Sequence, residues 1–207
     1  MTNLYDIFEI IGTVAFSISG ATTAIKKEMD LLGVIVLGMI TAVGGGILRD
    51  VIGNRTPSIF YQSDIIFLAF ATSLVIFLIA YISNVDFTEQ KYFFLIFTIS
   101  DSLGLAVFTI FGCQKMLCAY PSGAVIFFGV LTGVGGGLLR DILAGQKPYV
   151  LTKHFYASSC ILGALFYMGI RSYASGFAVL AGVSSIFILR LLAAKFKWNL
   201  PKVQQKN

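Results

Sequence analysis

The chain alternates long apolar stretches with short polar ones. Seven stretches are largely apolar, at residues 4–25, 31–53, 64–82, 92–112, 121–143, 155–170 and 174–194. A helix needs about 20 predominantly apolar residues to cross the hydrocarbon core of a membrane, so the pattern predicts seven transmembrane helices. The stretch at 155–170 is short for a span, and a buried hairpin that does not cross is the alternative there.

Composition supports the same interpretation. Hydrophobic residues make up 57% of the 207 residues and charged residues only 12%, and the mean hydropathy is +0.86. These values exclude an ordinary soluble domain. We therefore expect a single all-α integral membrane domain over residues 1–207.

One motif occurs twice. Residues 41–50 read Thr-Ala-Val-Gly-Gly-Gly-Ile-Leu-Arg-Asp and residues 132–141 read Thr-Gly-Val-Gly-Gly-Gly-Leu-Leu-Arg-Asp, identical at eight of ten positions. Pro57 and Pro148 keep the same offset of 91 residues, and upstream positions such as Phe16 and Phe108 correspond at an offset of 92. We infer two three-helix copies at 4–82 and 92–170, a seventh helix at 174–194 and a basic tail at 195–207.

The number of spans between the two motifs predicts their relative orientation. The stretches at 64–82 and 92–112 lie between the two glycine-bearing ones, so the second copy starts after three crossings. An odd number of crossings reverses the direction of the chain. The sequence thus predicts two inverted repeats related by a pseudo-two-fold axis in the membrane plane.

The distribution of Lys and Arg predicts the topology. With the N-terminus outside, four basic residues fall on the outer side: Arg49, Arg55, Lys115 and Arg171. Eleven fall on the inner side: Lys26, Lys27, Lys91, Arg140, Lys147, Lys153, Arg190, Lys195, Lys197, Lys202 and Lys206. The excess of inner charges favours an outer N-terminus and a cytoplasmic C-terminus. The basic tail is then an interface anchor, and we expect no nucleic-acid partner.

Each copy has three consecutive glycines inside an apolar stretch. They are Gly44, Gly45 and Gly46 in the first copy and Gly135, Gly136 and Gly137 in the second. A glycine in a helix costs about 1 kcal/mol relative to alanine, so a triplet favours a kink or an unwound turn. Unwound backbone at membrane depth lines a wet cavity or is buried in protein, and its carbonyls suit a dehydrated cation. The alternative is a stripe of small residues that lets helices pack closely.

Each triplet is followed by a charged pair, Arg49-Asp50 or Arg140-Asp141. A charge at this depth costs a few kcal/mol, so such groups pair with each other or face water. They are therefore candidates for charged vestibules that gate a pathway, one toward the outer mouth and one toward the inner mouth. An Arg-Asp clamp between helices is the structural alternative.

Other polar residues are placed to line the same pathway. Ser17 corresponds to Thr109, Thr41 to Thr132, and Glu9 to Asp101. We treat the four hydroxyl residues as candidate pore-lining groups, although hydroxyls in membrane helices commonly bond their own backbone. The two acids are candidates for the pathway or, alternatively, interfacial acids at helix starts.

No enzymatic chemistry is recognisable in the sequence. It has no nucleophile–base pair, phosphate loop or cofactor motif, and its three cysteines have no metal-binding spacing. We expect no catalytic residue, no metal site and no cofactor. The expected permeating species are potassium or sodium ions.

The duplicated Gly-Gly-Gly-x-Leu-Arg-Asp motif, in two three-helix copies with a seventh helix, resembles the prokaryotic branch of the trimeric intracellular cation (TRIC) channel family. The resemblance implies a homotrimer in a prokaryotic plasma membrane, with an hourglass pore for monovalent cations in each protomer. The kinked second and fifth helices of the family would be the stretches at 31–53 and 121–143. Animal members bind phosphoinositide through a basic motif in the second helix, where this chain has its glycine triplet.

The same sequence family is also catalogued under a glycine-transporter label. A channel and a secondary transporter of a small solute such as glycine both use inverted repeats and broken helices. We expect a cation channel, because each arginine that could bind a substrate carboxylate is followed by a neutralising aspartate. The transporter remains the alternative.

Overall fold

The computed structural model describes residues 4–83, 90–152, 155–173 and 175–198, and all regular elements in these ranges are helical. The elements are α1 (Leu4–Lys26), α2 (Leu31–Ile52), η1 (Ser58–Tyr61), α3 (Ser63–Ser83), α4 (Gln90–Met116), α5 (Ser122–Leu143), α6 (Tyr149–Thr152), α7 (Tyr156–Ile170) and α8 (Ser175–Phe196). The seven predicted stretches correspond to α1–α5, α7 and α8. The sequence did not predict the two short helical elements, η1 and α6.

Six of the described helices are long and apolar enough to cross a membrane, and α7, with 15 residues, is shorter. The predicted tail begins within the last turn of α8. Its residues from 199 onward lie outside the described part of the chain, as does Lys153.

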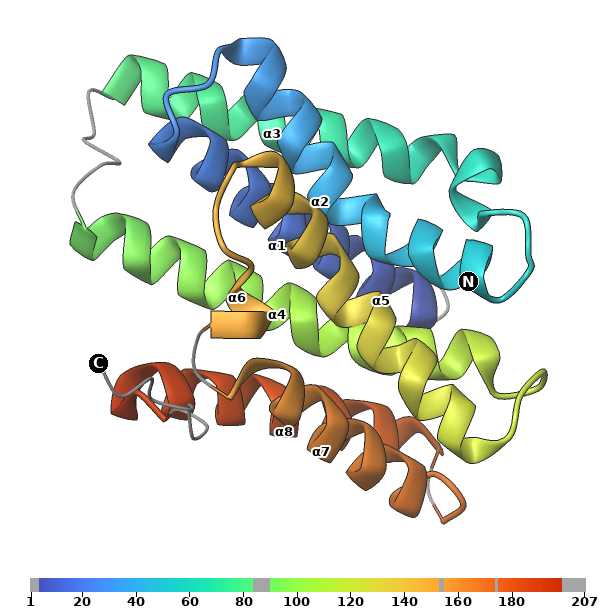
Figure 1. The fold of residues 1–207 in the computed structure, drawn as a ribbon. Coiled ribbons are helices and arrows are strands. Elements are labelled where there is room, and N and C mark those ends of the chain that lie inside the picture. The colour runs from blue at the N-terminus through green and yellow to red at the C-terminus, as the bar shows by residue number, and fades with distance from the viewer. Residues whose placement is uncertain (1–3, 84–89, 153–154, 174, 199–207) are drawn as a thin grey trace, which may run out of the picture.

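The interior of the molecule consists of α1, α2, α4 and α5, which pack on one another (Figure 1). On one side α3 packs against α1 and α2. On the other side α7 and α8 lie next to each other, with α8 against α4 and α7 against α4 and α5. Each copy thus has the same three-helix plan, and α8 is an addition to the second copy.

Both glycine triplets lie in uninterrupted helix. Every residue of α2 from Leu31 to Ile52 and of α5 from Ser122 to Leu143 is helical, so the unwound turn considered above is absent. The backbone carbonyls of the triplets are therefore not freed by unwinding. The glycines serve a different purpose, which is the close crossing of the two helices.

The α2–α5 crossing brings backbone against backbone. A Cβ atom on Gly45 would overlap the carbonyl oxygen of Thr132, and a Cβ atom on Gly136 would overlap the carbonyl oxygen of Thr41. Gly45 corresponds to Gly136 and Thr41 to Thr132, so one contact is made twice with the partners exchanged. This close approach supports the small-residue packing that was the alternative for the triplets.

The contact between α1 and α4 is reciprocal in the same way. The rings of Phe16 and Phe108, which are corresponding residues, lie 5.3 Å apart between centroids. Phe16 covers Gly104, and Phe108 covers the corresponding Gly12. Exchanged contacts of this kind are what a two-fold axis produces.

Candidate functional site

Each copy ends its glycine helix with an Arg-Asp pair that holds the following chain. The carbonyl of Arg49 accepts the N–H of Gly53, and the carbonyl of Arg140 accepts the N–H of Ala144, both at 2.9 Å. These bonds close the last turns of α2 and α5. The side chains of both arginines are buried in the interior of the helix bundle.

The aspartates anchor the two short elements that follow. Asp50 Oδ2 accepts the backbone N–H of Ser58 at 2.9 Å, and Asp141 Oδ2 accepts that of Tyr149 at 2.7 Å. Ser58 and Tyr149 are the first residues of η1 and α6, where N–H groups lack helical partners. Asp50 Oδ1 and Asp141 Oδ1 each accept from Nε of the preceding arginine, at 2.7 and 2.9 Å. Each aspartate thus joins an arginine to the returning chain.

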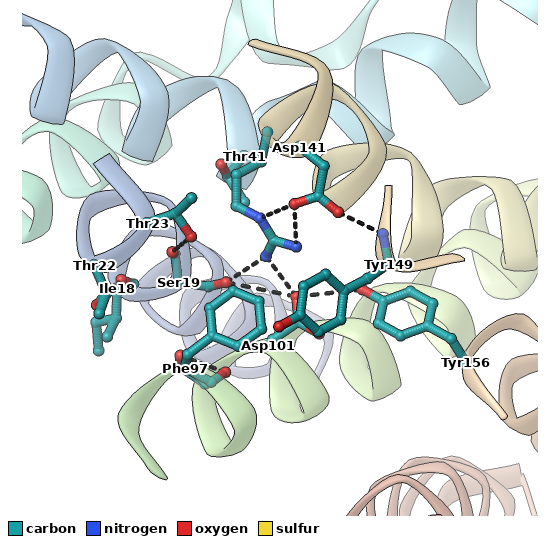
Figure 2. A network of polar contacts seen from close by, with 12 residues as sticks. Ile18, Ser19, Thr22, Thr23, Thr41, Phe97, Asp101, Asp141, Tyr149 and Tyr156 are labelled. Atoms are coloured by element: carbon teal, nitrogen blue, oxygen red, sulfur yellow. Dashed lines mark hydrogen bonds and ion pairs between the residues drawn. The ribbon is translucent and has the colours of Figure 1, made fainter. Parts of the chain in front are cut away.

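The second copy contains a network of polar contacts that includes Ser19, Asp101, Asp141 and Tyr156 (Figure 2). At its centre is Arg140, which is fully buried. Its Nη1 donates to Asp101 Oδ1 at 2.6 Å and to Ser19 Oγ at 2.5 Å. Its Cζ lies 4.6 Å from the ring centroid of Phe97. Asp101 Oδ1 also accepts the hydroxyl of Tyr156 at 3.2 Å. Residues of α1, α4, α5 and α7 therefore meet at one buried point.

The first copy is more open. Arg49 is only 2% exposed, yet its Nη1 has no hydrogen-bond partner among the described residues. Glu9 corresponds to Asp101, but no ion pair joins it to Arg49 in the described part of the chain. Its carboxylate instead accepts the amide of Gln62 at 3.0 Å. The first copy therefore holds the same charges as the second without the direct contact.

The two clusters lie at different heights along α1. The first, which we call the Arg49 cluster, consists of Arg49, Asp50 and Glu9. It is level with Glu9 and Thr13 of α1, which line the same cavity as Arg49. The Arg140 cluster is level with Ser19. Glu9 and Ser19 are about 15 Å apart along the helix, at 1.5 Å per residue. The two arginines thus lie at different levels along α1.

Cavities open at both ends of α1. Next to Arg49 is a cavity of about 30 Å³ whose lining includes Glu9, Gln62, Gly46 and Thr132, enough for roughly two water molecules. Glu9 and Gln62 also line an adjoining cavity of about 440 Å³, with Asp6 and Lys115 at its rim.

At the other end of α1, a cavity of about 310 Å³ is lined by Thr23, Lys26, Lys27, Phe97, Gln146 and Tyr149. Its floor contacts the Arg140 network through Phe97 and Tyr149. The molecule thus has a cavity with charged lining residues near each end of α1, and the charged clusters lie between the two cavities.

The predicted hydroxyl residues are buried, and three of them bond their own helices. Thr41, Thr109 and Thr132 donate to the carbonyl four residues earlier, at 2.6, 2.7 and 2.6 Å. Ser17 Oγ has no partner among the described residues. Of the predicted residues, Gly46, Arg49 and Thr132 line the small cavity, whereas Gly45, Gly135 and Gly136 lie in the helix crossing.

Two important residues were misjudged from the sequence. Asp101 lies well inside α4 and is fully buried, so the alternative of an acid at a helix start is wrong for this residue. Arg190 was counted only as an inner-side charge, but it is 2% exposed and its Nη2 lies 3.7 Å from Asp101 Oδ2. An arginine inside the apolar stretch at 174–194, with no counterpart in the duplication, was the available signal.

Comparison with known sequences matches both copies to one family. A family model described as a glycine transporter matches residues 6–81 and 98–172. The inner membrane protein YadS of Escherichia coli, a UPF0126 protein, is 34% identical over 202 residues, which are 93% of each chain.

Solved structures with the same fold are cation channels. One, from work on conductance through TRIC cation channels, has a TM-score of 0.84 and 35% identity, and the match covers 99% of this chain and 100% of that one. Another, a prokaryotic TRIC channel in 0.5 M KCl, has a TM-score of 0.87 and 29% identity over 95% of this chain and 98% of that one.

Proposed function

We propose a function from one premise: this chain belongs to the prokaryotic TRIC family of membrane proteins, the family whose sequence model is described as a glycine transporter. The proposed function is a homotrimeric, potassium-permeable channel for monovalent cations with one pore in each protomer. The observation that carries it is the pair of corresponding charge clusters at two levels along α1, each beside a cavity with charged lining residues.

The pathway that we propose runs between α1, α2, α4 and α5. It enters by the mouth at Asp6 and Glu9, passes Arg49 and the region where Gly136 approaches Phe16, and leaves past Arg140. The close α2–α5 crossing supplies a narrow waist between two wider ends, which is an hourglass. The described conformation is closed at the Arg140 network, where Nη1 of Arg140 donates its hydrogen bonds to Ser19 and Asp101 and has none left for water.

The proposed topology has the N-terminus outside and the C-terminus in the cytoplasm, with seven crossings and inverted copies. It is supported by the positive-inside count and by the exchanged contacts between the copies. It places the mouth with Asp6 and Glu9 outside and the mouth with Lys26 and Lys27 inside. The membrane is the prokaryotic plasma membrane, as in the E. coli relative.

The proposal is tested with purified protein in planar bilayers under a potassium gradient. Discrete, ohmic unitary currents that reverse near the potassium equilibrium potential are expected. Arg49→Ala and Arg140→Ala should each alter open probability, with opposite dependence on the side and sign of the voltage, because the two charges lie at opposite ends of the pathway. Absence of unitary current in trimeric protein, with electrically silent uptake of labelled glycine, would contradict the channel.

A second candidate function is favoured by the two opposite charges that line the small cavity without contacting each other. Arg49 and Glu9 both line this cavity, and Nη1 of Arg49 has no hydrogen-bond partner among the described residues. A positive and a negative group held apart in this way suit a small zwitterion, whose carboxylate would bind Arg49 and whose ammonium would bind Glu9. A transported amino acid such as glycine has this chemistry.

Ligand-dependent thermal stability distinguishes this candidate from the channel alone. Glycine should raise the melting temperature, whereas acetate and methylamine, which each have one of its two charges, should not. Glu9→Gln should abolish the effect. If glycine leaves the melting temperature unchanged at millimolar concentration, the small cavity holds only water or cations.

A further inference from the structure

Arg190 connects α8 to the charge cluster of the second copy. It lies six residues before the end of α8, and it has no corresponding residue because α8 belongs to neither copy. Its side chain is 2% exposed. An arginine buried this deeply in an apolar helix is expected to have a specific partner.

The partner is the carboxylate that already holds Arg140. Arg190 Nη2 lies 3.7 Å from Asp101 Oδ2, while Arg140 Nη1 binds Oδ1 of the same group at 2.6 Å. Arg190 Cζ lies 4.5 Å from the ring centroid of Tyr156, whose hydroxyl donates to Asp101 Oδ1. Arg190 therefore approaches the free edge of Asp101, since Oδ2 accepts no hydrogen bond from the described residues.

This contact makes the net charges of the two clusters different. The second cluster contains Arg140 and Arg190 with Asp101 and Asp141, so its net charge is zero. The first contains Arg49 with Glu9 and Asp50, so its net charge is −1. Asp6 and Lys115 line the adjoining cavity and carry opposite charges, so together they leave this net charge unchanged. A buried cluster with net negative charge attracts a cation, and a neutral one does not.

We infer that Arg190 is a positioning residue that occupies the free edge of Asp101 and thereby keeps the second half of the pathway closed to cations. This inference rests on the proposed cation channel. Without Arg190 the second cluster would have the net charge of the first, and Asp101 Oδ2 would be available to a permeating cation. Helix α8 is thus the element that makes the two halves of the pathway functionally unequal.

The first experiment compares the current–voltage relations of Arg190→Gln and the unsubstituted protein in symmetrical KCl. We expect the ratio of currents at opposite voltages to move toward unity in the variant, by roughly threefold to tenfold, as for one charge removed from beside the pathway at an effective dielectric constant of about 20. Arg190→Lys, which keeps the charge, should preserve the original ratio. Lys195→Gln removes a charge from the same helix outside the cluster and is the matched control.

A charge-rescue variant separates this role from mere support of the fold. Asp101→Asn combined with Arg190→Gln leaves Arg140 and Asp141, a neutral cluster, and should return the current ratio toward its original value. A residue needed only for packing would make the double variant worse than either single one. A double variant that fails to recover the ratio therefore overturns the inference.

The second experiment does not depend on conduction. Ser19→Cys is introduced in a background without Cys113, Cys118 and Cys160, and is treated with a membrane-impermeant methanethiosulfonate. Ser19 is fully buried against Arg140, so labelling should be slow and should accelerate severalfold with Arg190→Gln. Thr13→Cys, which reports on the cavity beside Arg49, should label at an unchanged rate.

The outcomes distinguish the two proposals. If the unsubstituted protein passes no current but Arg190→Gln accelerates labelling at position 19, the channel is wrong and the closing contact is right. If current flows and the folded, trimeric Arg190→Gln protein keeps both its current ratio and its labelling rate, the channel stands and the role of Arg190 is overturned.

Discussion

At the scale of single residues, the two copies use the same side chains under different constraints. Arg140 and Asp101 are in direct contact and fully buried, whereas the corresponding Arg49 and Glu9 face a cavity and do not pair. Removing one partner of a buried ion pair leaves an uncompensated charge, which costs much more than losing an exposed pair. The corresponding acids should therefore differ in their importance for stability.

We expect Asp101→Asn to lower the free energy of unfolding by on the order of 3 kcal/mol, because Arg140 and Arg190 lose their shared carboxylate. The corresponding Glu9→Gln should change it by about 1 kcal/mol or less, because this carboxylate is partly exposed. Thermal unfolding of the two variants in the same detergent measures the difference. Equal destabilisation would contradict the asymmetry between the clusters.

The sequence predicted the charged residues of the site better than their partners. The duplication identified Arg49, Asp50, Arg140 and Asp141, because charges in an apolar stretch stand out. It could not reveal that Asp101 pairs with Arg140, since that contact depends on how α4 crosses α5. It also could not assign Arg190, because correspondence between copies says nothing about a residue on the unpaired helix.

At the scale of the elements, the glycine triplets determine how closely α2 and α5 approach. The pattern predicted the helices well, since each is a long apolar stretch. It missed η1 and α6, which have four residues each, too few to show an apolar period, and whose first N–H groups are held by aspartate side chains. It also allowed an unwound turn, because a run of glycines is compatible both with unwinding and with a close crossing.

We expect Gly45→Ala and Gly136→Ala each to destabilise the protein by about 1 to 3 kcal/mol, because the added methyl group would overlap a backbone carbonyl. Gly46→Ala is the matched control within the same triplet, since its Cβ would lie 3.9 Å from Nη2 of Arg49, an ordinary van der Waals contact. It should be neutral or slightly stabilising. Equal effects at positions 45 and 46 in thermal unfolding would show that the crossing does not set the cost.

At the scale of the whole molecule, a nearly symmetric pair of copies carries one asymmetric addition. The exchanged contacts show that α1 corresponds to α4 and α2 to α5. The short elements η1 and α6 also correspond, because an aspartate accepts the first N–H group of each. Only α8 lies outside this relation, and it packs on α4 and α7. Duplication and apolar length are both visible along the chain, but the ion pair that α8 contributes required the structure.

The exchanged α2–α5 contact has a consequence for how the two halves recognise each other. Each half presents a glycine groove and a threonine carbonyl that fit the other half, as two copies of a single shorter ancestor would in a dimer.

The covalent link between α3 and α4 should then be dispensable. Residues 1–86 and 87–207, produced as separate polypeptides in one cell, should assemble and purify together from the membrane. Gly45→Leu in the first fragment should prevent this assembly, whereas Gly123→Leu in the second, at a position with no atom within 4 Å of a Cβ, should permit it. The gene fusion that joined the halves would thus have supplied equal numbers of each half and let their sequences diverge. It would not have been needed for the two halves to recognise each other.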